Sequence, residues 1–341
     1  MDWSAWRDEF PTFRRTMYLN TCSLAPLSRR VRAAQEQFFD EWEALGASAW
    51  YERWMSALHD LREKVARILG ARSDEIALAP SVSVALSSVA SAVDYRSRPR
   101  VVMSEIDFPT LAYQWAVKPE AAPILVASEG RVTVRPEAFE HAVDDRTSIV
   151  ATSHVYYTSG AIQDIARVAR IAHRHGALAI VDAYQATGQL PTDVKAADVD
   201  VLVTGGLKWL LGGTGIAFLY VRKALIPKLS PTIAGWFGNA RMFDFDPKAF
   251  AFHDTARRFE LGTPSLAAVY AASAGLDIVL EIGVDRLRQR TTQVTTDLIE
   301  RLGAAGFEIR TPASPDDRAG IVMIPAKDPA KTVKALATRK F

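Results

Sequence analysis

The chain has 341 residues, a length that favours two domains over one. It is 49% hydrophobic and 23% charged, as is ordinary for a globular protein, and its net charge of +2 with scattered Lys and Arg gives no basic stripe for nucleic acid. The single cysteine, Cys22, excludes an internal disulfide and fits a reducing compartment. Because no segment predicts a signal peptide or a membrane span, we expect a cytoplasmic protein.

The first part of the chain is irregular up to residue 27, and helices then fit 28–45 and 51–69, the second ended by Gly70. Short β-branched apolar runs follow and alternate with helical patterns, which is typical of strands buried on both faces. Strands are predicted at 100–104, 147–152, 177–182, 200–204 and 216–221, and helices at 82–93, 111–117 and 165–175. This pattern predicts an α/β fold around a mostly parallel central sheet sandwiched by helices.

Beyond residue 225 the pattern loosens, and long helices then fit 265–283 and 284–303. Strands near 307–310 and 320–324, with a helix from 329, suggest a small α+β domain. Two strands alone are marginal, so either this sheet is small and backed by helices, or the natural chain continues past Phe341. We expect an N-terminal segment at 1–79, which forms part of the small domain and the mouth of the active site, a large domain at 80–254 and a C-terminal small domain at 255–341.

An acidic residue, Asp182, follows the predicted strand at 177–181. Ligands of open parallel sheets bind at the carboxyl ends of strands. Asp182 is therefore either the N-cap of the next helix or a buried carboxylate held beside a cationic ring nitrogen, and its sequence context leaves both open.

A lysine, Lys208, lies among five glycines between two predicted strands, in Thr204-Gly205-Gly206-Leu207-Lys208-Trp209 and Gly212-Gly213-Thr214-Gly215. One interpretation is a glycine-rich turn with a surface lysine. The other is close packing around Lys208, which would favour its neutral amine, a nucleophile for aldehydes. Neither a P-loop nor a dinucleotide fingerprint matches these glycines.

The predicted helix at 82–93 begins with Ser81-Val82-Ser83, which is either a plain N-cap or an anion site. An acid, a lysine and a helix-start anion site in one α/β sheet are the three parts that bind pyridoxal 5'-phosphate (PLP). The acid keeps the pyridine nitrogen protonated, the lysine forms a Schiff base, and the helix start holds the phosphate.

At this point the sequence resembles the class V aminotransferase family of fold-type I PLP enzymes, which includes kynureninases, cysteine desulfurases and isopenicillin N epimerase. Seven motifs carry the resemblance in order: Tyr18-Leu19-Asn20-Thr21-Cys22-Ser23, Ser81-Val82-Ser83-Val84, Asp107-Phe108-Pro109-Thr110, His154-Val155-Tyr156-Tyr157-Thr158-Ser159-Gly160, Val181-Asp182-Ala183-Tyr184-Gln185, the Lys208 segment, and Arg258-Phe259-Glu260-Leu261-Gly262-Thr263-Pro264. Each motif is weak alone, and their order makes the prediction of a PLP enzyme strong.

The resemblance implies a role for each matching residue. Lys208 and Asp182 would be catalytic, Lys208 as the Schiff-base lysine and Asp182 as the partner of the pyridine nitrogen. The cofactor would also contact Val82, Ser83 and Tyr157. Phe108 would stack on its ring, and Gln185 would lie near the ring oxygen. Thr263 would reach the phosphate of the cofactor bound in the neighbouring subunit, which implies a homodimer. Asn20, Cys22 and Trp236 are predicted on the substrate side of the pocket.

Departures from the family pattern bear on the reaction. No cysteine follows Cys22, which disfavours a desulfurase unless a further part of the chain supplies one, and no motif identifies an arginine for the substrate carboxylate. Leu207 stands where relatives place a His or Tyr that helps to hold the phosphate.

We therefore expect a PLP-dependent enzyme acting on an amino acid, either an aminotransferase or a kynureninase-like lyase. A desulfurase or epimerase type of reaction, or a PLP-fold regulator without catalysis, is the alternative. The six histidines predict no metal site. His154 is either catalytic or a packed core histidine.

Overall fold

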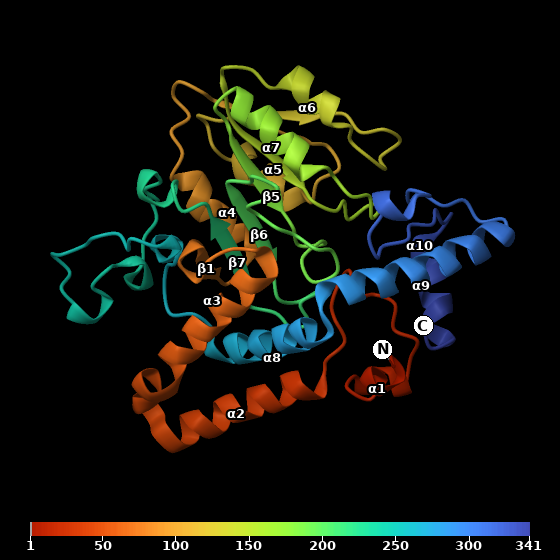
Figure 1. Cartoon of the computed structure of the whole chain (residues 1–341), viewed down its shortest axis with the longest axis horizontal. Helices are drawn as coiled ribbons and strands as arrows, with labels where there is room; N and C mark the ends of the chain where they lie inside the picture. The colour runs from red at the N-terminus through yellow and green to blue at the C-terminus, as the bar shows by residue number, and fades with distance from the viewer. Residues whose placement is uncertain (1) are drawn as a thin grey trace.

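The computed structural model describes residues 2–341 and is built around one seven-stranded sheet (Figure 1). The strands are β1 (Ile76–Ala79), β2 (Arg100–Ser104), β3 (Ala122–Val126), β4 (Thr147–Ser153), β5 (Leu178–Asp182), β6 (Val201–Gly205) and β7 (Ala217–Val221). The helices are α1 (Ser4–Arg7), α2 (Arg29–Leu45), α3 (Met55–Leu69), α4 (Val82–Ser91), α5 (Pro109–Ala116), α6 (Pro136–Ala142), α7 (Ile165–Arg174), α8 (Leu266–Ile282), α9 (Val284–Ala304) and α10 (Pro329–Thr338).

The strand order is β1-β7-β6-β5-β4-β2-β3, and β6, β5, β4, β2 and β3 are parallel neighbours. Only β7 runs the other way, antiparallel to both β6 and β1. The predicted mostly parallel sheet and the α/β class are therefore confirmed. Continuous apolar runs of β-branched residues carried that prediction, because strands covered on both faces need no polar alternation.

The sequence pattern did not predict the two edge strands, β1 and β3. The strand β1 has only one β-branched residue, Ile76, among alanines and leucine, so its β propensity is low. The strand β3 contains Pro123 and has three exposed residues, which suits an edge strand and hides the usual pattern. Both segments become strands because they pair with a neighbouring strand of the sheet, β1 with β7 and β3 with β2. Local sequence does not show this pairing.

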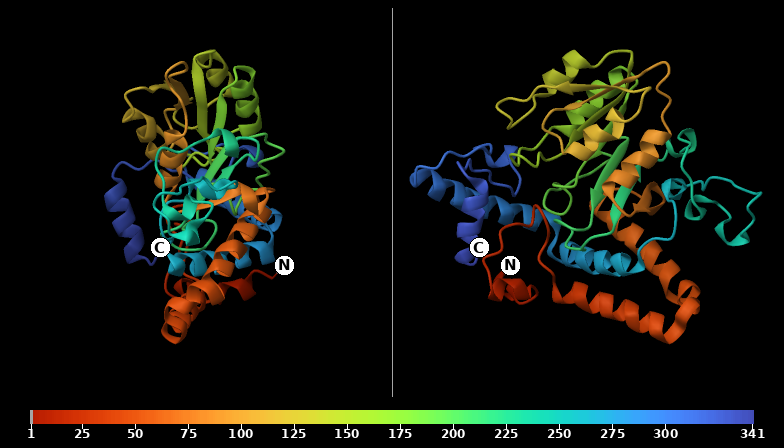
Figure 2. Two further views of the ribbon diagram at one scale, coloured as in Figure 1. Left: turned by 90° about the vertical axis from the view of Figure 1, so that its left-hand side faces the viewer. Right: turned by 180° about the vertical axis from the view of Figure 1, so that it is seen from behind.

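Helices cover both faces of the sheet, as Figure 1 and the two views of Figure 2 show. Alternate residues of each strand point to opposite faces. In β6, Val201 and Val203 pack with the residues of α4 and α5, whereas Leu202 packs on the face covered by α3, α6 and α7. Burial of these two apolar layers stabilises the sheet between its helices.

The C-terminal part differs from its prediction. The strands expected near 307–310 and 320–324 do not form, and that prediction is wrong. The two segments share one backbone hydrogen bond, from Arg310 N–H to the Met323 carbonyl at 2.8 Å, and Met323 N–H donates instead to the Thr311 hydroxyl. A pair of segments with no third strand beside it has too few ladder bonds to persist as a sheet.

The helices of this part were predicted correctly. Both long helices are present as α8 and α9, and α10 begins at Pro329 with the Asp328 side chain as its N-cap. Among residues 2–341 no single helix is long and apolar enough to cross a membrane, while α8 and α9 pass such a test only as a pair bent by 78°. The proposed domain limits at 79/80 and 254/255 stay a prediction, although β1 already belongs to the sheet.

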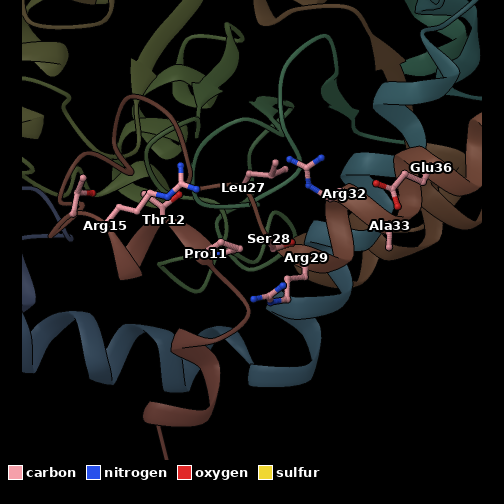
Figure 3. Close-up of a pocket in the computed structure, with 10 residues that line it drawn as sticks. Pro11, Thr12, Arg15, Leu27, Ser28, Arg29, Arg32, Ala33 and Glu36 are labelled. Carbon is pink, nitrogen blue, oxygen red and sulfur yellow. The ribbon is translucent and has the colours of Figure 1, made fainter.

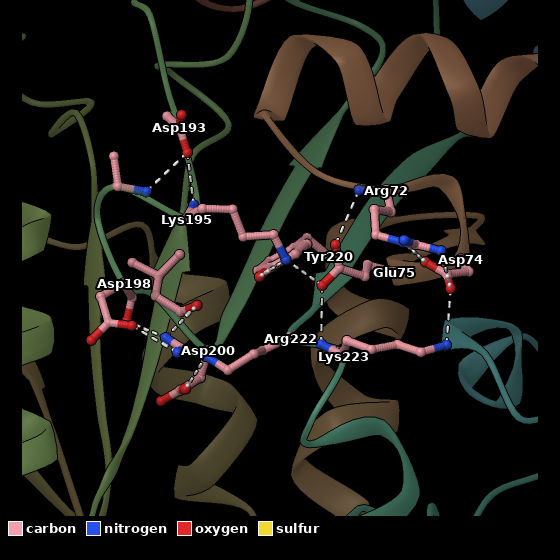
Figure 4. A network of polar contacts seen from close by, with 12 residues as sticks. Arg72, Asp74, Glu75, Asp193, Lys195, Asp198, Asp200, Tyr220, Arg222 and Lys223 are labelled. Atoms are coloured by element: carbon pink, nitrogen blue, oxygen red, sulfur yellow. Dashed lines mark hydrogen bonds and ion pairs between the residues drawn. The ribbon is translucent and has the colours of Figure 1, made fainter.

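At the end of the sheet where the parallel strands begin, charged side chains form ion pairs and hydrogen bonds (Figure 4). Glu75, which precedes β1, is fully buried and accepts from the Lys195 ammonium and from the Lys223 backbone N–H. Asp200, which precedes β6, pairs with Arg222 just after β7. The charged groups at this end of the sheet are therefore paired with one another. The opposite end, where β4, β5 and β6 finish, holds the candidate active site.

One ion pair joins three distant segments. Glu260 accepts from the Arg62 guanidinium of α3 through both carboxylate oxygens, at 2.7 and 2.9 Å, and also from the Leu78 N–H of β1 at 3.0 Å. Both charged side chains are buried. A buried pair of this kind becomes costly when one partner is removed, because the other charge stays without a partner in a medium of low polarity.

We predict that Glu260→Ala lowers the free energy of unfolding by about 3–5 kcal/mol. The matched control is Asp297→Ala, which removes the exposed partner of Arg301 on α9 and should cost less than about 1 kcal/mol. Urea denaturation followed by tryptophan fluorescence measures both. Equal losses of unfolding free energy in the two variants would contradict the prediction that the buried Glu260–Arg62 pair stabilises the fold more than an exposed pair does.

A buried histidine, His154, follows β4. Its backbone N–H donates to the Asp182 carbonyl at 2.9 Å, and within residues 2–341 its ring has one hydrogen-bond partner, the Thr192 hydroxyl at 3.5 Å. Burial lowers the pKa of His154 to about 4, from a usual value near 6.5. The ring is therefore neutral near pH 7 and packed in the core.

This pKa predicts an acid-sensitive contribution to stability. As the pH falls, the histidine takes up a proton in the unfolded chain near pH 6.5 but in the folded chain only near pH 4. The neutral buried ring therefore contributes its full stabilisation above pH 6.5 and loses it as the pH falls towards 4, on the order of 3 kcal/mol in all. In His154→Gln the free energy of unfolding should fall less steeply over this pH range than in the parent protein. The same replacement at the exposed His59 should leave the slope unchanged, and an unchanged slope in His154→Gln would contradict the prediction.

Candidate active site

The carboxyl ends of neighbouring parallel strands meet around one small pocket. Ser153, the last residue of β4, is in register with Asp182, the last residue of β5, and Asp182 is in turn in register with Val203 of β6. The pocket is lined by Phe108, Ser153, Val155, Tyr157, Asp182, Tyr184, Gln185 and Lys208. Five of these residues, namely Phe108, Tyr157, Asp182, Gln185 and Lys208, were predicted from the sequence as site residues.

Asp182 is a buried carboxylate with spare hydrogen-bonding capacity. Its Oδ1 accepts from the Tyr184 backbone N–H at 2.9 Å, and among the described residues nothing donates to its other oxygen. Burial raises the pKa of Asp182, while the nearby positive charge of Lys208 acts in the opposite direction. The carboxylate is thus held in place at the strand end with one oxygen left for a cationic partner.

Lys208 faces the same pocket, with its ammonium between two aromatic rings. The Nζ atom lies 4.7 Å from the centroid of the Tyr184 ring and 5.8 Å from that of Phe108. It forms no ion pair with any residue of the described range 2–341. Burial lowers the pKa of Lys208 and so brings its amine closer to the neutral, nucleophilic form, although Asp182 opposes this shift.

The glycines around Lys208 are required by close packing, as the second interpretation of the sequence predicts. A side-chain carbon at Gly205 would lie 2.2 Å from the Tyr184 ring, and one at Gly212 would lie 2.5 Å from the Ala272 backbone of α8. Any larger residue at these two positions would push the lysine turn away from the sheet or from α8.

Phe108 and Tyr157 form one side of the pocket. Their rings make an edge-to-face contact with centroids 5.2 Å apart, and Phe108 immediately precedes α5, which begins at Pro109. The neighbouring Asp107 holds this turn against the strand ends, because its carboxylate accepts from the backbone N–H groups of Ser104 and Ser153 at 2.8 and 2.7 Å. Burial raises the pKa of Asp107 to about 7.

The start of α4 lies beside this turn. Ser81 is the N-cap, and its hydroxyl accepts from the Val84 N–H at 3.3 Å. The Ser83 hydroxyl is exposed and lies 3.4 Å from that of Thr110, while Val82 is buried. Two hydroxyls and the free N–H groups of a helix start are therefore close to Phe108, in an arrangement suited to an anion. Thr110 was not singled out from the sequence, although its motif contained it.

The N-terminal segment passes over the lysine turn. We call residues 18–25 the N-terminal strap. Gln185 donates its side-chain amide to the Cys22 carbonyl at 2.9 Å, and the Ala25 N–H donates to the Leu207 carbonyl at 2.8 Å. The Cys22 thiol lies 3.4 Å from the Asn20 Oδ1 atom, and burial raises the pKa of this thiol. Asn20 and Cys22 are thus beside the pocket without lining it.

Six predicted residues do not line this pocket in their own chain: Val82 and Ser83 at the start of α4, Asn20 and Cys22 in the strap, and Thr263 and Trp236. Thr263 is exposed in the loop before α8. Trp236 packs against Phe237 and Phe245, with ring centroids 4.7 and 6.1 Å away, in a segment that extends from the sheet at the left of Figure 1. The residues missed by the sequence reading are Ser153, Val155 and Tyr184, and the tyrosine was present in the quoted motif.

A second cavity, of about 460 Å³, lies between the N-terminal segment and α2 (Figure 3). It is lined by Pro11, Thr12, Arg15, Thr16, Leu27, Ser28, Arg29, Arg32, Ala33 and Glu36. None of the predicted site residues reaches it, and it offers no lysine. The pocket at the strand ends is the candidate active site, because it lies at the carboxyl ends of the parallel strands and five predicted site residues line it.

The residues of that pocket fit PLP. A lysine without an ion-pair partner and a buried carboxylate with one free oxygen match an aldehyde and a cationic ring nitrogen, respectively. The hydroxyls at the start of α4 suit a phosphate, and Phe108 offers an aromatic face.

Comparisons with known proteins agree with this geometry. The sequence profile of the family described as Aminotransferase class-V matches residues 17–339. The chain is 34% identical to a Bacillus subtilis protein named "Uncharacterized aminotransferase YcbU", over 98% of this chain and 88% of that protein. It is 31% identical to the kynureninase of Deinococcus radiodurans, over 86% of this chain and 72% of that protein, and 31% identical to a probable cysteine desulfurase of Methanothermobacter thermautotrophicus, over 86% and 74%.

Solved structures share the fold. The apo cysteine desulfurase of Thermococcus onnurineus superposes with a TM-score of 0.90 at 21% identity, covering 99% of this chain and 86% of that one. The cystine C–S lyase C-DES gives 0.88 at 18% identity, covering 97% and 90%. The predicted type I fold is confirmed. This chain belongs to the aminotransferase class-V family and is a PLP-dependent enzyme.

Proposed function

We propose that the pocket at the strand ends carries out a reaction at the α-carbon of an amino acid, with Lys208 as the cofactor-bearing lysine and acid–base group. The observation that supports this most is the presence of Lys208 and Asp182 in one pocket, each without a partner that would satisfy it. When bound, PLP withdraws electrons from the substrate and so makes its α-proton acidic.

Each residue then has a definite task. Asp182, held by the Tyr184 N–H, would accept a hydrogen bond from the protonated ring nitrogen, whose positive charge would favour the ionised carboxylate against the effect of burial. Lys208, released by the substrate amine, would take the proton from the α-carbon or return it, which its lowered pKa favours. Phe108 would contact the ring, and Tyr157 supports Phe108 through their edge-to-face contact.

The phosphate would be held at the start of α4, by Ser83 and the backbone around Val82. Gln185 would lie near the ring oxygen, and the N-terminal strap would place Asn20 and Cys22 beside the pocket on its substrate side. This set has no cationic residue of its own for the phosphate, which is consistent with Leu207 at the position where relatives have a His or Tyr.

The reaction favoured is aminotransfer or a kynureninase-like cleavage over desulfuration. A desulfurase needs a thiolate nucleophile, and Cys22 is the only cysteine in the sequence. Its thiol is close to Asn20, and burial raises its pKa, so that it remains protonated and weakly nucleophilic near pH 7. A regulator without catalysis would have no use for a lysine with a lowered pKa beside a buried carboxylate.

We also propose a homodimer in the cytoplasm. Thr263 and Trp236 do not reach the pocket of their own chain, so any contact with a cofactor or substrate would be made in the partner's site. Large aromatic side chains are exposed on α2, on the turn before α3 and on the segment that carries Trp236: Phe39, Trp42, Tyr51, Phe243, Phe245 and Phe250. Aromatic patches of this kind are typical of protein interfaces.

We predict that Lys208→Ala abolishes the visible absorbance that PLP gives with the parent protein and lowers turnover by at least about 10³-fold. Asp182→Asn should keep the absorbance but lower turnover by about 10²-fold, because the amide cannot hold a cationic ring nitrogen. The control is Lys223→Ala, which removes a lysine paired with Asp74 at the opposite end of the sheet. If the parent protein stays colourless with PLP, or if Lys208→Ala behaves as the control does, the proposed role of Lys208 fails.

The type of reaction can be assigned with a panel of amino acids. Exchange of the α-proton for deuterium, followed by NMR in D₂O, should occur with the parent protein and vanish in Lys208→Ala. Formation of a new amino acid from an added 2-oxo acid would identify an aminotransferase. Release of alanine together with a carboxylic acid from an amino acid that carries a β-acyl group, with water as the second reactant, would identify a kynureninase-like lyase. Sulfide release from cysteine as the sole activity would instead contradict this proposal.

Subunit mixing tests the dimer. Sedimentation should give twice the chain mass of 37.5 kDa. If Thr263 serves the partner's site, Lys208→Ala and Thr263→Ala proteins, each impaired alone, should recover activity when mixed, since one of the two sites in a mixed dimer then has both residues intact. A monomeric mass, or no recovery despite exchange of subunits, would count against a shared site.

A further inference from the structure

The side-chain amide of Gln185 is held at both of its polar atoms. The indole N–H of Trp209 donates to the Gln185 Oε1 atom at 2.8 Å, and the Gln185 Nε2 atom donates to the Cys22 carbonyl at 2.9 Å. Gln185 thus links the residue that follows Lys208 with the N-terminal strap.

Trp209 determines which way this amide points. An indole nitrogen can only donate, so the atom that faces it has to be the amide oxygen. The NH₂ group is then directed at the strap, where it meets an acceptor. If the amide turned over, its oxygen would face the Cys22 carbonyl and its NH₂ group would face the indole N–H, so both hydrogen bonds would be lost.

The indole ring is itself fixed by its surroundings. Its far end lies against Gly320, where an added side-chain carbon would come within 3.2 Å of the ring. Gly320 is held there because its N–H donates to Gln189 Oε1 at 2.7 Å, and Gln189 donates in turn to the Gln185 carbonyl at 2.5 Å. A half-buried ring with these contacts has little freedom to leave Gln185.

The strap is therefore attached to both neighbours of Lys208. Leu207, before the lysine, accepts directly from the Ala25 N–H at 2.8 Å. Trp209, after the lysine, reaches Cys22 through Gln185. Any shift of the lysine turn relative to the strap would break at least one of these links.

We propose that Trp209 is a positioning residue that orients the Gln185 amide and thereby fixes the N-terminal strap over Lys208. Its consequence for the substrate rests on the proposed function, in which Asn20 and Cys22 of the strap lie beside the pocket on its substrate side. The strap contact itself depends on no cofactor and can be measured without one.

The test is hydrogen exchange of the full chain without added PLP. Trp209→Phe keeps an aromatic ring but removes the donor, and backbone amides of residues 18–25 should exchange about 5- to 10-fold faster, as expected for loss of one hydrogen bond. Amides of β4 and β5 should keep their protection. Trp115→Phe is the matched control, since it removes another buried indole donor, the one that bonds the Tyr95 hydroxyl at 2.8 Å, far from the strap in sequence.

A second variant shows whether Trp209 acts through Gln185. Gln185→Leu should speed exchange of the strap by a similar factor, and the double variant with Trp209→Phe should add no more than about 2-fold. Unchanged strap exchange in Trp209→Phe, additive effects in the double variant, or an equal effect of Trp115→Phe would each overturn the proposal.

With PLP and a substrate found in the amino-acid panel, Trp209→Phe should raise KM about 5- to 10-fold and change kcat less than about 2-fold. A loss confined to kcat would overturn a positioning role on the substrate side. If the parent protein binds no PLP, the proposed function fails, yet the exchange result of the strap still decides the role of Trp209.

Discussion

The register of three parallel strands is the constraint on which the rest of the site depends. Pairing of Ser153 with Asp182, and of Asp182 with Val203, brings the carboxyl ends of β4, β5 and β6 to one edge of the sheet. Loops leaving that edge have to carry their first side chains into a common space, and Asp182, Tyr184 and Val155 lie there for this reason. A shift by one residue would turn Asp182 into the apolar layer between sheet and helices.

Charge is distributed unequally between the two ends of this sheet. At the end where the parallel strands begin, buried Glu75 is paired with Lys195 and buried Asp200 with Arg222. At the other end, neither Asp182 nor Lys208 forms an ion pair with any residue of the described range 2–341. Unmatched buried charges cost stability, so a fold retains them where a ligand supplies the missing partners.

Close packing holds the lysine turn in a single place. Gly205 leaves room for the Tyr184 ring and Gly212 leaves room for the backbone of α8, so the turn packs closely against both the sheet side and α8. The N-terminal strap then covers it through Leu207 and Gln185. Segments from the beginning, middle and end of the chain thus meet at one lysine, and none of them could form this arrangement alone.

The sequence by itself determined the layers of the fold and the chemistry of the site. Continuous apolar runs located the five central strands, and the residues just after them, Asp182 and Lys208, identified the cofactor class. It did not determine the edge strands, because Ile76–Ala79 and Ala122–Val126 have weak local propensity and become strands through their neighbours. It also predicted C-terminal strands that do not form, since a strand needs a partner ladder as well as a suitable composition. Only the tertiary structure decided that Gln185 bonds Trp209 and Cys22, and that Thr263 and Trp236 lie away from their own pocket. Those relations depend on distances between segments far apart in the chain, which local patterns of residues do not encode.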